Sequence, residues 1–118
     1  MSNTVRASEV LSKHTYDSDT YYMDFSQLIG SRTISTVDSV TASDSNLTIA
    51  ADAVLASDTT VTDKDGNSVT LTANKAITFT LSGGTEQTEG PLYAEVTAKI
   101  TLSDGSQKGL IGKLLIEE

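Results

Sequence analysis

Few residues of this chain are of the types that carry out acid–base, nucleophilic or metal chemistry. The sequence has no Cys and a single His, His14. A thiolate nucleophile, a thiolate metal site and a disulfide are therefore excluded. A catalytic triad or a zinc site would have to be organised around His14, which lies in a polar segment with no second His beside it. We expect His14 to be solvated, and we expect a protein that is not an enzyme and holds no cofactor.

The carboxylates are numerous but poorly spaced for a metal site. Residues 63–67 (DKDGN) resemble the start of a calcium-binding loop. However, the glycine follows the first Asp by three positions instead of five, and the Glu that closes such a loop is missing. Residues 16–20 (YDSDT) form a second acidic cluster, which is typical of a solvated hinge. We therefore expect no metal, and a polar hairpin turn at residues 63–67.

Composition limits the classes of partner. The chain has 16 acidic and 8 basic residues, a formal net charge of −8, which opposes binding to nucleic acid. No stretch approaches the ~20 apolar residues that span a bilayer, and the first residues lack the apolar core of a secretory signal. We expect a protein synthesised in a host cytoplasm without a signal peptide, with neither nucleic acid nor membrane as partner.

The elements that must position any site are short strands. Apolar and hydroxyl residues alternate with a period of two, and turn residues recur every 8–12 positions. The 18 Thr and 15 Ser suit the solvent faces of such strands. This pattern predicts an all-β, immunoglobulin-like antiparallel β-sandwich of about seven strands over residues 19–118, preceded by an extended N-terminal arm, residues 1–18. Strands are expected at residues 21–26, 33–41, 47–50, 59–62, 68–72, 76–81, 92–102 and 110–116, with residues 51–56 either extending a strand or forming a helical turn. No amphipathic helix is expected.

Two segments could contact a partner. In residues 21–25 (YYMDF) the adjacent Tyr21 and Tyr22 must point to opposite faces of a strand. One of them is either part of an interface, where Tyr is enriched, or caps the edge of the core. In the arm, Val10, Leu11 and Tyr16 are the candidate apolar anchors. The arm either lies against another subunit or folds back on its own domain.

Several motifs resemble those of a known family. They are Tyr22, Asp24 and Phe25 with Leu28 and Gly30, then residues 33–35 (TIS), residues 81–85 (LSGGT), and Tyr93 at the start of an alternating strand. In this order they are similar to small immunoglobulin-like virion proteins of tailed bacteriophages, of the head-decoration and fibre–tail adaptor types. The chain departs from that family in Gln27-Leu28, where a Trp is common, and in a longer middle segment, residues 51–72. Tyr93 is placed as in the tyrosine corner of immunoglobulin-type sandwiches.

The resemblance implies a non-enzymatic structural protein on the outer surface of a virion. A capsid decoration protein comes first and a neck or tail–fibre adaptor second, docking through the arm by strand addition or apolar contacts. The expected partners are capsid, neck or tail subunits and further copies of the chain. The alternative is an immunoglobulin-like module that binds carbohydrate or a cell surface.

Overall fold

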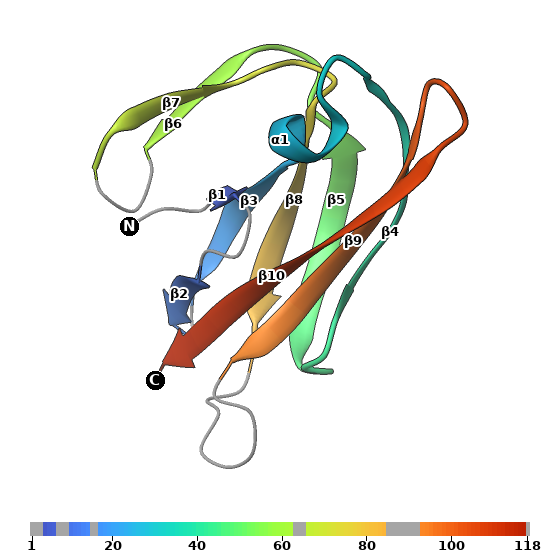
Figure 1. Cartoon of the computed structure of the whole chain (residues 1–118). Helices are drawn as coiled ribbons and strands as arrows, with labels where there is room; N and C mark the ends of the chain where they lie inside the picture. The colour runs from blue at the N-terminus through green and yellow to red at the C-terminus, as the bar shows by residue number, and fades with distance from the viewer. Residues whose placement is uncertain (1–3, 7–9, 15–16, 63–65, 85–92, 118) are drawn as a thin grey trace.

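The computed structural model describes residues 4–6, 10–14, 17–62, 66–84 and 93–117, and for the first two ranges it describes the backbone. In these ranges the chain forms ten strands and one short helix (Figure 1). The elements are β1 (Thr4–Arg6), β2 (Val10–His14), β3 (Ser18–Asp24), α1 (Ser26–Ile29), β4 (Ile34–Ala42), β5 (Leu47–Val54), β6 (Thr59–Thr62), β7 (Ser68–Leu71), β8 (Ala76–Gly83), β9 (Ala94–Leu102) and β10 (Gln107–Glu117).

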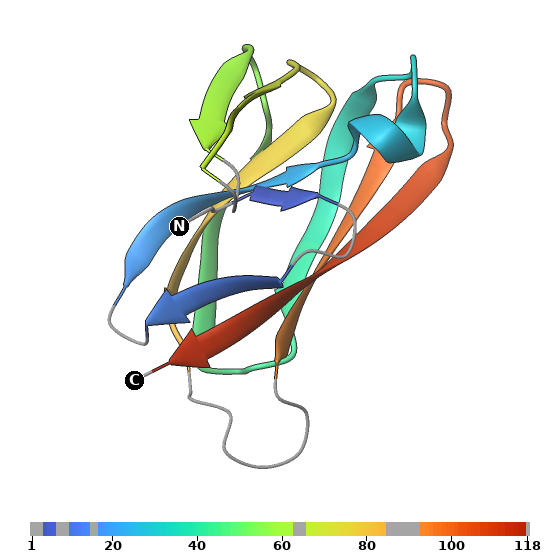
Figure 2. The same cartoon turned by 60° about the vertical axis from the view of Figure 1, so that its left-hand side comes forward.

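The strands form two four-stranded sheets that pack face to face, with a two-stranded hairpin beside them (Figure 2). One sheet has the order β1-β3-β8-β5 and is called the β3–β8 sheet below. The other has the order β2-β10-β9-β4 and is called the β9–β10 sheet. The hairpin pairs β6 with β7. The prediction of an all-β sandwich is confirmed, and its central strands pair antiparallel.

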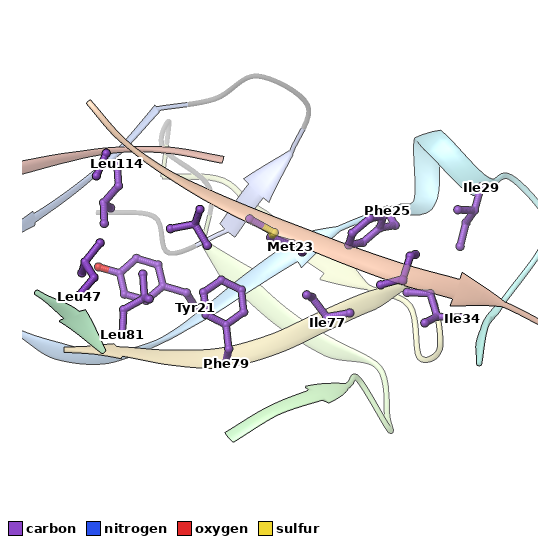
Figure 3. Close-up of a cluster of buried hydrophobic side chains, with 14 of the residues drawn as sticks. Tyr21, Met23, Phe25, Ile29, Ile34, Leu47, Ile77, Phe79, Leu81 and Leu114 are labelled. Atoms are coloured by element: carbon purple, nitrogen blue, oxygen red, sulfur yellow. The ribbon is translucent and has the colours of Figure 1, made fainter. Parts of the chain in front are cut away.

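The core forms because the inward side chains of both sheets are apolar. Along β9 the buried residues alternate with half-buried and exposed ones, as the sequence pattern predicts. From the β3–β8 sheet, Tyr21 and Phe79 stack with ring centroids 6.5 Å apart. Figure 3 shows both rings between the sheets, with Met23, Ile77 and Leu81 around them. The space left beside the rings measures about 10 Å³, which holds at most one water molecule.

The strand expected at residues 21–26 is β3, which ends earlier than expected and is followed by a helical turn. The sequence predicted a strand through residue 26 and no amphipathic helix, whereas β3 ends at Asp24 and α1 occupies Ser26–Ile29. The turn allows Phe25 and Ile29, four positions apart, to enter the core together, at 0% and 2% exposure. The Asp24 carboxylate accepts a hydrogen bond from the backbone amide of Ser26 at 3.0 Å, which directs the chain into the helical turn.

The described parts of the arm pair with the sheets of their own chain. β1 runs parallel to β3, and β2 runs parallel to the end of β10. These pairings add edge strands from residues 1–18 to the antiparallel sandwich expected over residues 19–118. No local pattern predicted them, because the strand pairing of a chain terminus depends on contacts far along the sequence.

The ambiguous segment after residue 50 is a strand. β5 continues to Val54 with a register shift between Ala50 and Ala53, where Ala51 adopts a φ of 55°. Such a bulge lets the strand bend while its pairing with β8 resumes. The β6–β7 hairpin follows and packs on Tyr22 through the small cluster of Leu55, Leu71 and Ala76.

Two adjacent glycines at the end of β8 allow a close backbone approach. Gly83 has a φ of 72°, and a Cβ placed there would lie 2.7 Å from the carbonyl oxygen of Asn46. Gly84 donates its amide to that same oxygen at 3.0 Å. Gly83 and Gly84 therefore hold the turn before β5 against the end of β8.

Candidate functional site

The outer face of the β9–β10 sheet brings an exposed apolar residue and two lysines to one side of a chain with a net charge of −8. Because side chains alternate along a strand, the even positions of β9 fill the core and the odd positions face outward. The pairing with β10 then brings its odd positions to the same outer side. We call this surface the outer face; its residues on these two strands are Glu95, Thr97, Lys99, Thr101, Gln107, Gly109, Ile111 and Lys113.

An exposed apolar side chain lies in the middle of the outer face. Ile111 is 50% exposed and stands directly opposite Thr97 in the pairing of β10 with β9. Among the described residues, one other large apolar side chain is exposed, Leu28 on α1, at 43%. A single exposed apolar residue needs no explanation. The position of Ile111 becomes informative through the polar groups that surround it.

An open depression of about 420 Å³ lies beside Ile111, toward the β9–β10 turn. It is lined by Asp38 from β4, Lys99 and Ile100 from β9, and Gln107, Lys108 and Gly109 from β10. Gly109 of β10 pairs opposite Lys99 of β9. Because glycine has no side chain, nothing projects from β10 at this position of the outer face. Ammonium, carboxylate and amide groups converge here, which suits a polar or charged group of a partner.

The carboxylate of Asp38 is held in place by two hydroxyl groups. Thr101 donates to Asp38 Oδ2 at 2.6 Å, and Thr36 donates to Asp38 Oδ1 at 3.0 Å. Register shifts between Ile34 and Thr36 and between Val37 and Ser39 flank these residues. The irregular β4 thereby turns Asp38 to the outer side instead of the core.

The outer face carries cations in a chain whose net charge is −8. Lys99 and Lys113 are exposed on it, and Lys108 lines its depression. Within the described residues these lysines form no ion pair, although Glu95 stands directly opposite Lys113. The described ion pair is elsewhere, between Arg32 and Asp104 at 3.9 Å. The charges of the outer face therefore remain available to a partner.

Of the five residues that the sequence proposed as partner contacts, two lie in the edge strand beside β10, two lie in β3, and one lies outside the described residues. Val10 and Leu11 belong to β2 and pair with Lys113 and Leu114 of β10. Tyr16 lies outside the described residues.

The two adjacent tyrosines divide between core and hairpin. Tyr21 is 3% exposed in the core. Burial, reinforced by the carboxylates of Asp19 and Asp17, raises the pKa of its phenol to about 12. Tyr22 is half-buried on the opposite side, under the β6–β7 hairpin. One tyrosine therefore packs inward and the other is covered from outside by the hairpin.

The other candidate groups add no second site to the described structure. His14 pairs through its backbone with Glu117. Residues 63–65 of the calcium-like sequence lie outside the described residues. In the described ranges, no three His, Cys, Asp or Glu side chains are grouped so as to hold a metal ion. Tyr93 is half-buried, and the loop expected to accept its hydroxyl lies outside the description. No helix in the described part of the chain has the length and apolarity to cross a membrane.

Sequence reasoning missed the outer face for an identifiable reason. It began the last strand at residue 110. β10 begins at Gln107, so Gln107, Lys108 and Gly109 belong to the strand and complete the face. The polar residues that start β10 have no apolar alternation. The available signal was the turn sequence of residues 103–106 (SDGS), directly after which β10 begins.

Comparisons with known proteins assign the chain to no family. No protein-family model matches the sequence, and no curated protein matches it either.

Proposed function

We propose that this chain is an immunoglobulin-like, non-enzymatic structural protein of a tailed-phage virion that binds neighbouring subunits through its outer face. Within that class, a capsid decoration protein is the first choice and a neck or tail–fibre adaptor the second. The observation that carries the proposal is the outer face itself, where exposed Ile111 lies on the same side as Lys99 and Lys113, which form no ion pair within the described residues of this acidic chain. An apolar centre with a polar rim is the usual anatomy of a protein interface.

The strand order supports the immunoglobulin-like identity. In constant-type immunoglobulin domains, strands A, B, E and D form one sheet, and C, F and G form the other. The orders β3-β8-β5 and β10-β9-β4 match the B-E-D and G-F-C parts of this scheme. The parallel pairing of β1 with β3 departs from it. The β6–β7 hairpin is inserted between the D-like and E-like strands. It accounts for the longer middle segment that distinguishes the sequence from the phage proteins it resembles.

The free edges also favour binding through a face. β4 and β5 are the outer strands at one side of the sandwich, and both contain register shifts. Bulges of this kind interrupt the ladder that an added strand would need. At the other side the edge strands are β1 and β2, which have three and five residues, and such short edge strands offer little length to an added strand. Strand addition is therefore less favoured than side-chain contacts on the outer face, and the arm contributes chiefly by completing both sheets.

The experiment is to purify phage particles from a host that expresses the chain and to measure its copy number by quantitative mass spectrometry. The proposal expects stoichiometric incorporation, and expects Ile111→Asp to reduce occupancy at least about tenfold, since a charge then replaces the apolar centre. Leu28→Asp is the matched control, because it changes the other exposed apolar residue. If wild-type particles lack the chain, the virion role is wrong. If Leu28→Asp removes it while Ile111→Asp does not, the binding surface is the α1 end.

The depression beside Gly109 gives the carbohydrate-binding alternative a specific basis. Its carboxylate, amide and ammonium groups are of the types that bind sugar hydroxyls. A glycan array separates the two functions: binding that is lost in Asp38→Ala supports the carbohydrate module, and an array without binders contradicts it.

A further inference from the structure

We propose that the outer face binds a second copy of this chain, in a two-fold symmetric, face-to-face dimer centred on Ile111. This inference rests on the proposed function, since it names the partner of the same surface. It follows from the order of side chains on both sides of the Ile111–Thr97 pair.

The outer face is complementary to itself. Consider a two-fold axis that lies between two such faces and runs across the strands, over Ile111 and Thr97. Such an axis reverses the strand direction, so each residue meets the one equally far on the other side of the centre. Glu95 lies two positions before Thr97, and Lys99 lies two positions after it. Glu95 of each copy therefore meets Lys99 of the other.

The same two-fold axis also sets which residues of β10 meet in the two copies. Lys113 lies two positions after Ile111, and Gly109 lies two positions before it. Lys113 of each copy is therefore placed over Gly109 of the other, where no side chain stands and the depression begins. Asp38 supplies a carboxylate at that depression, held by its two hydroxyl donors. At the centre, Ile111 meets Ile111, so the exposed apolar side chain is covered in both copies.

Charge selects a second copy over an unrelated acidic partner. The face carries Glu95 and Lys99 at mirrored positions, and Asp38 lines the depression over which Lys113 of the other copy is placed. A surface adapted to an acidic partner would carry lysines without the intervening carboxylates. Because neither Lys99 nor Lys113 is engaged in an ion pair in the described structure, forming the dimer breaks no existing pair.

The area predicts a weak dimer. β9 has nine residues, so the face is about 30 Å long at ~3.3 Å per residue. Its width across β10, β9 and β4, with strands ~4.8 Å apart, is about 14 Å. Two copies would bury about 850 Å² in total, in the range of weak and transient interfaces. The dimer therefore forms at high concentration or in an assembly that holds copies side by side.

Sedimentation equilibrium of the full chain, from about 10 μM to 1 mM, tests this dimer in the range where weak interfaces associate. The perturbing variant is Glu95→Lys, which places lysines opposite each other and is expected to weaken association at least about tenfold. The double variant Glu95→Lys/Lys99→Glu exchanges both signs, retains the wild-type net charge and is expected to restore association. Asp52→Lys, on exposed β5, is the control with the same change in net charge as Glu95→Lys.

Three outcomes overturn the dimer: a wild-type chain that stays monomeric throughout, a double variant as weak as Glu95→Lys, or an Asp52→Lys variant as weak as Glu95→Lys. Far-UV circular dichroism confirms that each variant remains folded. The particle experiment separates this inference from the function on which it rests. If the wild-type chain never dimerises and the Glu95→Lys variant is incorporated into particles at the wild-type copy number, the dimer alone is refuted. If the wild-type chain dimerises but is absent from particles, the virion role is refuted.

Discussion

Substitution of Gly83 tests whether the glycine pair at the end of β8 is required by the fold. Its φ of 72° lies in the left-handed region, which costs a residue with a Cβ about 1–2 kcal/mol. Alanine there also places its Cβ 2.7 Å from the Asn46 carbonyl oxygen, which must move although it accepts the Gly84 amide. Such overpacking adds about 1–3 kcal/mol. We expect Gly83→Ala to lower the free energy of unfolding by about 2–5 kcal/mol in total.

The chain supplies a matched control for the clash. Gly105 has a φ of 89°, and a Cβ there meets no atom within 4 Å. Gly105→Ala therefore carries the backbone cost without the clash. Urea unfolding followed by far-UV circular dichroism gives both free energies, and equal m-values make them comparable. If Gly83→Ala loses no more stability than Gly105→Ala, the close approach of Asn46 does not constrain the fold, and the structural explanation of the glycine pair is wrong.

Two further substitutions, one of them with a control, test the core. The Tyr21 pKa of about 12 lies above its ordinary value of 10.0, so its contribution to stability is complete below pH 10 and is lost as the pH rises toward 12. Over this interval the wild type should lose up to about 2–3 kcal/mol more than Tyr21→Phe, as measured by urea unfolding at each pH. In α1, Ile29→Ala should cost about 2–4 kcal/mol because the side chain is buried, whereas Leu28→Ala should change the unfolding free energy by less than about 0.5 kcal/mol; equal losses would contradict the assigned faces of α1.

The sandwich could be predicted because its strands carry their burial in the sequence. β9 alternates buried and outward residues along its whole length, and β8 buries Ile77, Phe79 and Leu81 at every second position. Short local patterns of this kind need no knowledge of neighbours. The α1 turn was missed because four residues are too few to show a helical period, and its cause is the pairing of Phe25 with Ile29 in the core.

The outer face required knowledge that no local pattern contains. Glu95, Lys99, Ile111 and Gly109 are individually ordinary surface residues in the sequence. Their mirrored arrangement appears only when Thr97 is known to pair with Ile111. The pairing of β1 and β2 with β3 and β10 was left open for the same reason, since partners far apart in the sequence are chosen by the assembled sheets.

The register of the outer face is set by the turn between β9 and β10. Leu102 donates its amide to the Ser106 carbonyl at 2.7 Å and accepts the Gly105 amide at 2.9 Å. Asp104 closes the turn by accepting the Ser106 amide at 2.9 Å. The backbone amide of Ser103 also bonds the Thr33 carbonyl at 2.9 Å, which ties the turn to the segment before β4.

A slip of one residue at this turn would reverse every side chain of β10. Ile111 would then enter the core and Leu110 would replace it outside. The same slip would separate Gly109 from Lys99 and Lys113 from Glu95, although none of these residues would have changed. The turn residues therefore specify the binding surface without being part of its centre. The self-complementarity of the outer face is therefore a property of the whole β9–β10 hairpin. The exchange of charges in Glu95→Lys/Lys99→Glu tests the pairing register of β9 with β10 as directly as it tests the dimer.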